Sequence, residues 1–230
     1  MSWYFVGLDL GQSHDFTAIA AVERVETTGE WDAAMFAFRR VVKLRLRYLE
    51  RPELGTPYPE IVERVAEVTR SPELAGRCKL IADATGVGAP VVDMLRKSRI
   101  GCTLMPVLIT GGNTENLTNG YYHVPKRDLI VGLQTTLQCG GLEIAAALPL
   151  GAALMQELAD LRVKITLPGR EQYGAWREGQ HDDLVLAVAL ACWGARKVYP
   201  NPPAGEEGYW RRKEPWPDLA KTLLAADERG

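Results

Sequence analysis

An apolar stretch near the N-terminus, Trp-Tyr-Phe-Val-Gly-Leu-Asp-Leu-Gly over residues 3–11, carries a single carboxylate close to its end. Aromatic and branched residues at this density predict a buried strand. A buried carboxylate without a partner is costly or becomes protonated, so Asp9 needs a metal ion, another cation or backbone donors beside it. The alternative is an acid that only caps the turn at residues 10–13. Any site in this chain should therefore be sought around Asp9.

Composition limits the size and surroundings of the fold. With 230 residues, 47% of them hydrophobic, we expect one domain over residues 1–197 and a Pro-rich, aromatic and basic tail over residues 198–230. No apolar run reaches the ~18 residues that a membrane span requires, and no signal-peptide pattern is present, so we expect a cytoplasmic protein without a membrane partner. The four cysteines lack Cys-x-x-Cys spacing, which predicts single buried thiols. A net charge of −2 is unusual for a nucleic-acid-binding domain, although a local basic face can coexist with it.

The first part of the chain predicts three consecutive antiparallel strands. The turn at residues 11–15 leaves no room for a crossover helix before the strand at residues 16–24, so these two strands form a hairpin. A turn at residues 27–30 leads to a third strand over residues 33–46. A basic run on and after this strand could contact a phosphate backbone or simply keep an exposed face in water: Arg39, Arg40, Lys43, Arg45, Arg47 and Arg51.

The following segments predict strands connected by helices. Helical periodicity over residues 59–69 precedes an apolar strand at residues 79–82, which ends in Asp83 and leads through small residues into a helix over residues 89–97. Such a strand lies parallel to its neighbour, and sites gather at the carboxyl ends of parallel strands, so Asp83 should share an edge with Asp9. The other expected elements are a strand over residues 103–109, a mobile loop over 110–120, an extended segment over 121–124, helices over 126–140 and 150–161, a strand over 142–145 and a hairpin over 163–176.

A second group of acids, in Gln180-His181-Asp182-Asp183, opens a strongly apolar helix over residues 184–195. Unpaired N–H groups and the helix dipole favour carboxylates in a first turn, so a plain N-cap is one interpretation. Adjacent helical residues point about 100° apart, so one acid can face a site while the other caps the helix. We expect Asp183 to face inward, with Asp182 as the next candidate for this role. His181 could move protons or hold a ligand, but a hydrogen bond that flanks the helix is the preferred role.

Together these elements predict an α/β fold, a ribonuclease-H-like mixed sheet in which a three-strand antiparallel meander continues into parallel strands and is flanked by helices. The sequence also resembles the nuclease domain of phage terminase large subunits over about residues 4–196. The motifs that carry the resemblance are Gly7-Leu8-Asp9-Leu10-Gly11 with Asp15-Phe16-Thr17-Ala18-Ile19, Ile81-Ala82-Asp83, Val124-Pro125-Lys126 and, most specifically, His181-Asp182-Asp183-Leu184-Val185. The Gly-x-x-x-x-Gly-Lys-Ser/Thr motif of the terminase ATPase motor is absent, so the resemblance does not extend to DNA translocation.

The resemblance implies hydrolysis of DNA during viral packaging by a phage- or prophage-encoded protein. DNA and other packaging components, such as a separate ATPase, a portal and a small terminase, are the implied partners. Two Mg²⁺ or Mn²⁺ ions ~3.5–4 Å apart can activate water and relieve charge at the leaving oxygen, and these ions prefer oxygen ligands. We expect Asp9 to bridge the ions, Asp83 to bind one of them, and Asp183 with Asp182 to bind the other. Possible DNA contacts are Lys126, Arg45 and Arg47.

Three alternatives remain open. Asp-Leu-Gly-Gln-Ser after a first strand also occurs at the phosphate loop of actin-like ATPases and sugar kinases, but the second Asp-x-Gly motif of those proteins is missing. A non-catalytic packaging adaptor could keep the fold and would bind no divalent ion. A Holliday-junction-type resolvase would prefer branched DNA and form an obligate dimer.

Overall fold

A computed structural model describes residues 2–11, 15–86, 88–160, 162–166, 170–174 and 181–197 of the chain. The strands are β1 (Trp3–Asp9), β2 (Ala18–Asp32), β3 (Ala37–Glu50), β4 (Cys78–Asp83), β5 (Thr103–Thr110), β6 (Asn116–Thr118), β7 (Tyr121–Pro125), β8 (Leu142–Ile144), β9 (Arg162–Thr166) and β10 (Arg170–Gly174). The helices are α1 (Tyr58–Arg70), α2 (Gly88–Lys97), α3 (Lys126–Gln138), α4 (Gly151–Asp160) and α5 (Asp183–Lys197).

Eight of the described strands form one mixed sheet in the order β6-β7-β5-β4-β1-β2-β3-β8, while β9 and β10 pair separately. β1, β2 and β3 form the antiparallel meander, and β4, β5 and β7 continue the sheet as parallel strands. The predicted ribonuclease-H-like mixed sheet is therefore confirmed. No helix among the described residues has both the length and the apolar character needed to cross a membrane.

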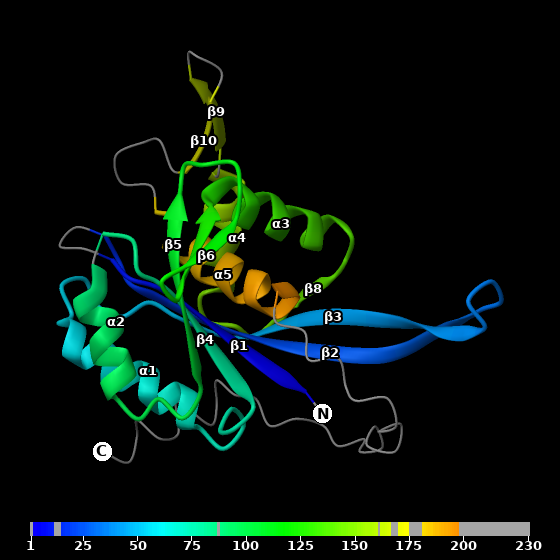
Figure 1. Cartoon of the computed structure of the whole chain (residues 1–230), viewed down its shortest axis with the longest axis horizontal. Helices are drawn as coiled ribbons and strands as arrows, with labels where there is room; N and C mark the ends of the chain where they lie inside the picture. Colours follow the sequence, from blue (N-terminus) through cyan, green and yellow to red (C-terminus); the bar gives the residue numbers. More distant parts are fainter. Residues whose placement is uncertain are drawn as a thin grey trace.

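The side chains of β1 alternate between two hydrophobic layers. Phe5 packs with residues of α3, α4 and α5, whereas Tyr4, Val6 and Leu8 pack with residues of α1 and α2. This alternation is the period of two that a strand buried on both faces imposes. The sheet thus lies between α1 and α2 on one side and α3 to α5 on the other (Figure 1).

Helix α5 is the central element of its layer. Every residue from Asp183 to Ala195 is buried, which explains why its sequence is apolar on all sides rather than along one stripe. The helix comes so close to the sheet that a Cβ added at Gly7 would lie 1.9 Å from the carbonyl oxygen of Ala187. Only glycine permits this approach, and it fixes the start of α5 relative to the end of β1.

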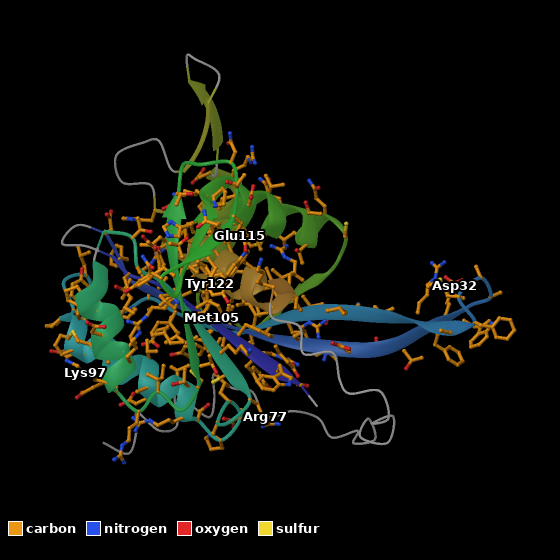
Figure 2. All side chains as sticks on the ribbon, viewed as in Figure 1. Asp32, Arg77, Lys97, Met105, Glu115 and Tyr122 are labelled. Atoms are coloured by element: carbon orange, nitrogen blue, oxygen red, sulfur yellow. The ribbon has the colours of Figure 1, made fainter. Side chains whose placement is uncertain are left out.

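The β2–β3 ribbon is longer than the sequence predicted. β2 continues to Asp32 through the turn expected at residues 27–30, and β3 begins at Ala37 rather than at residue 33. Thr28 and Gly29, which predicted a turn, instead lie where the strand register shifts in a β-bulge between Thr28 and Trp31. Beyond this bulge, Trp31 pairs with Phe38. Asp32 marks the tip of this ribbon, which projects away from the helices (Figures 1 and 2).

Two other predictions need correction. Residues 110–120 are not simply a mobile loop, because β6 lies within them and pairs with β7 across Asn119 and Gly120, both at positive φ. The cysteines are not all buried thiols, since Cys139 is exposed and Cys102 is only partly buried. The hairpin expected at residues 163–176 is present as β9 and β10. The predicted tail, residues 198–230, and the predicted turn residue His14 lie outside the described residues.

Candidate active site

The first two predicted acids occupy neighbouring positions at one edge of the sheet. β1 and β4 run parallel with Leu8 opposite Ala82, so the next residues, Asp9 and Asp83, end the two strands at the same level. Each of these residues is only 8% exposed. The backbone N–H of Thr85 donates a hydrogen bond of 2.8 Å to Asp83 Oδ1, which holds that carboxylate at the strand end.

Helix α5 brings two more acids to this edge. Asp183, its first residue, is 4% exposed, and Asp182 precedes it. Burial raises the pKa of Asp9 well above its usual value, and the charges of Asp83, Asp183 and Asp182 raise it further. The structure therefore gathers the four predicted acids (Asp9, Asp83, Asp182 and Asp183) into one carboxylate site.

A lysine at the start of α3 faces the same acids. β7 lies parallel to β5 and ends at Pro125, which delivers Lys126 to the carboxyl edge of the sheet. Its Nζ donates a hydrogen bond of 2.8 Å to Asp182 Oδ2. Its charge also opposes the burial that raises the pKa of Asp83, and it lowers the pKa of Asp9. Lys126 is thus a cation of the carboxylate site.

Two charged residues of the site had not been assigned to it from the sequence. Arg51 follows β3, and its Nη2 lies 3.2 Å from Asp183 Oδ2 while it also contacts Glu157 of α4. Glu157 Oε2 accepts hydrogen bonds from the backbone N–H groups of Leu184 (3.0 Å) and Val185 (3.3 Å), so it caps α5 from another helix. A sequence signal for Glu157 exists, because it shares the buried face of α4 with Leu154.

Aromatic contacts complete this corner of the site. The Arg51 guanidinium lies over the Phe16 ring, 5.1 Å from its centroid, and Phe16 meets the His181 ring edge to face at 5.0 Å. His181 Nδ1 is 3.8 Å from Asp183 Oδ2. Burial raises the pKa of Asp183 to about 6 although Arg51 and His181 both lower it. The contacts place His181 beside the first turn of α5.

Replacing Arg51 by alanine tests the importance of this cation. The Arg51→Ala variant should lose about 2–3 kcal/mol of unfolding free energy in urea, because Glu157 and Asp183 would remain buried without the charge that lies between them. Arg51→Lys should recover only part of the loss, since an ammonium group lacks the planar fork. Arg96→Ala is the matched control, because its ion pair with Asp93 is exposed. Equal losses of unfolding free energy in Arg51→Ala and Arg96→Ala would contradict the role of Arg51 as the cation that stabilises the buried acids.

The donor set of the site suits a hard cation. Its acids offer only oxygen, the ligand that Mg²⁺ and Mn²⁺ prefer, and the buried Asp183 Oδ2 accepts no hydrogen bond from the described residues. Within the described part of the chain, no three Asp, Glu, His or Cys side chains converge closely enough to hold an ion. The carboxylates are gathered at one edge, and an ion would have to draw them together.

The predicted DNA contacts on β3 have partners within the protein. Arg45 Nε donates a hydrogen bond of 2.8 Å to Glu143 Oε2. Arg47 Nη2 lies 2.8 Å from Oε2 of the buried Glu23. Lys43 also binds Glu143, and these hydrogen bonds lower the pKa of that acid. DNA binding by Arg45 and Arg47 stays a prediction.

Comparisons with known proteins find similarity at the level of structure. No family model matches the sequence, and a search of curated proteins found no match. The crystal structure of the large terminase nuclease from the thermophilic phage G20c is 21% identical, has a TM-score of 0.56 and covers 83% of this chain and 81% of that one. The structure of the same nuclease with bound magnesium is 22% identical, with a TM-score of 0.55 over 84% and 81% of the two chains. The large terminase nuclease domain of Thermus phage P74-26 is 19% identical, with a TM-score of 0.51, and the match covers 83% of this chain and 78% of that one. The chain therefore has the ribonuclease-H-like fold of phage large terminase nuclease domains.

Proposed function

We propose that this protein is a metal-dependent DNA endonuclease that acts in phage DNA packaging. The observation that carries the proposal is the carboxylate site, in which two strand ends and one helix start bring four acids to the same edge of the sheet. Burial and the charges of the other acids raise the pKa of Asp9, a cost that a bound cation would offset. The terminase nuclease fold supports the proposal, as does the magnesium bound to the similar G20c nuclease.

The residues divide into ligands and neighbours. Two Mg²⁺ or Mn²⁺ ions, when bound, would activate a water and neutralise charge on the leaving oxygen of the phosphodiester. Asp9, whose pKa is raised by the charges of the other three acids, would bridge the ions; Asp83 would bind one, and Asp183 with Asp182 the other. Lys126 would orient Asp182 and meet the charge of the DNA phosphate. DNA and the other components of a packaging machine are the proposed partners.

The pH dependence of metal binding follows from the raised pKa values. The pKa of Asp183 in the folded state, about 6, lies above the ordinary value of 3.8, so protons bind the folded state more tightly and the metal-free protein loses stability as pH rises through this window. Metal must displace those protons. Mn²⁺ should therefore raise Tm more at about pH 8 than at about pH 5. An equal shift in Tm at both pH values would contradict a carboxylate metal site.

Cleavage of supercoiled plasmid tests the activity itself. Purified protein should nick or linearise the plasmid with Mn²⁺ or Mg²⁺ and leave it intact with EDTA. If no metal supports cleavage of any DNA form and calorimetry detects no Mn²⁺ binding, the protein is a non-catalytic adaptor. A strong preference for branched over linear DNA would instead identify a resolvase-type enzyme.

A further inference from the structure

Two cysteines stand side by side at the edge of the sheet opposite the carboxylate site. β4 and β5 are parallel with Lys79 opposite Thr103, so Cys78 and Cys102 occupy the preceding step of the same register. Neighbouring strands lie about 4.8 Å apart, within the Cα separation of about 4.4–6.8 Å that a disulfide spans. The strand register therefore gives the two residues a Cα separation that a disulfide can bridge.

The two side chains also share a face of the sheet. Both pack in the hydrophobic layer beneath α1 and α2, and each thiol shifts the pKa of the other. The Cys78 thiol is buried and has the carbonyl oxygen of Thr69 at 3.6 Å, whereas Cys102 is partly exposed. Cys102 is thus the more accessible of the two residues, and Cys78 is the buried one.

An open cavity gives small oxidants access to the pair. It measures about 740 Å³ and is lined by both cysteines together with Lys79, Arg96 and Arg99. The neighbouring Cys78 thiol lowers the pKa of the Cys102 thiol, and a thiolate is the nucleophilic form of cysteine. Access, thiolate character and a resolving neighbour are the features that distinguish redox-active cysteines from inert buried ones.

We propose that Cys78 and Cys102 form a reversible intrachain disulfide when the protein meets a peroxide. The Cys102 thiolate first attacks the peroxide, gains one oxygen as a sulfenic acid and releases water. The Cys78 thiol then attacks the sulfenic sulfur, the S–S bond forms, and the oxygen leaves as a second water. Two thiols lose two electrons and one peroxide becomes two waters. A dithiol reductant restores the starting state by exchange.

The disulfide is a modification site separate from the proposed nuclease chemistry. It joins the first residue of β4 to the start of β5, while Asp83 stands at the other end of β4. The disulfide would therefore form whether or not the protein binds metal or cleaves DNA, and its test can fail independently of the proposed function.

Peptide mapping of the full chain tests the proposal directly. The reduced protein is treated with hydrogen peroxide, alkylated and digested with trypsin, which cuts after Arg77, Lys79 and Arg99. A disulfide leaves the dipeptide of Cys78 and Lys79 attached to the peptide that begins at Ile100. We expect this linked species to form in the monomer with loss of two of the four thiols, and dithiothreitol to abolish it.

Variants separate this pair from the other cysteines. Cys139→Ser, which removes the exposed thiol, should form the link as the wild type does. Cys78→Ser, or Cys78→Ala if serine disturbs the buried position, should accumulate a Cys102 sulfenic acid that dimedone traps. The proposal is overturned if wild-type Cys102 stays unmodified, oxidises past the sulfenic acid without linking, or links to Cys139, Cys192 or another molecule.

Discussion

Asp9→Asn should abolish metal-dependent DNA cleavage and, in the absence of metal, make the protein more stable. Asp9 lies among the other acids of the site, so its loss should reduce cleavage by more than about 100-fold, the loss that removal of even an outer-shell partner of a metal ligand can cause. Without metal, the ionised carboxylate is buried among like charges that raise its pKa, and a neutral amide of the same shape removes that repulsion.

Two measurements on the same variant check this prediction. In EDTA at about pH 8, the Tm of Asp9→Asn should exceed that of the wild type, each kcal/mol gained corresponding to about 2–4 °C for a chain of this size. Asp93→Asn, at an exposed acid of α2, is the control and should change neither cleavage nor Tm appreciably. Retained cleavage would show that Asp9 is not part of the active site. A lower Tm in EDTA would show that the Asp9 carboxylate stabilises the fold as a cap of the following turn.

Gly7→Ala should destabilise the protein more than Arg51→Ala does. The new Cβ would lie 1.9 Å from Ala187 O and 2.9 Å from Ala191 N, and these backbone atoms of α5 cannot move aside as a flexible side chain could. Overpacking usually costs about 1–3 kcal/mol, and we expect the free energy of unfolding in urea to fall by at least about 3 kcal/mol. Cleavage should fall as well, because α5 carries Asp183.

A second glycine supplies the control. A Cβ at Gly111 would meet no described atom within 4 Å. The free energy of unfolding of Gly111→Ala should therefore lie within about 0.5 kcal/mol of the wild-type value. If Gly7→Ala behaves like Gly111→Ala, α5 does not pack against β1 as described.

The fold, and the position of the four acids at one edge of the sheet, could be predicted from the sequence because both follow from local patterns. Asp9 and Asp83 each end an apolar strand, and parallel strands align their carboxyl ends at one edge. Asp183 could be placed because the helix behind it is too apolar to lie anywhere but against the sheet. What these residues do chemically stays a prediction until cleavage is measured.

The missed features depend on contacts between distant segments. Arg51 and Glu157 are separated by 106 positions, and a basic run gives no sign of which arginine turns inward. The β2–β3 turn was misplaced because Gly29 permits both a turn and a bulge, and the pairing of Trp31 with Phe38 decides between them. Cys78 and Cys102 come together only through the strand register, which cysteine spacing in the sequence does not report.

The position of α5 also determines when the site can exist during synthesis. Asp9 and Asp83 leave the ribosome long before Asp183, which follows Asp83 by 100 residues. At the usual elongation rates that interval lasts about 5–20 s. Throughout it, the centre of one face of the sheet lacks the helix that buries it. A nascent chain would therefore have two of the four acids in place while the other two are still missing. The order of the elements along the chain thus delays assembly of the proposed nuclease site until α5 has been translated.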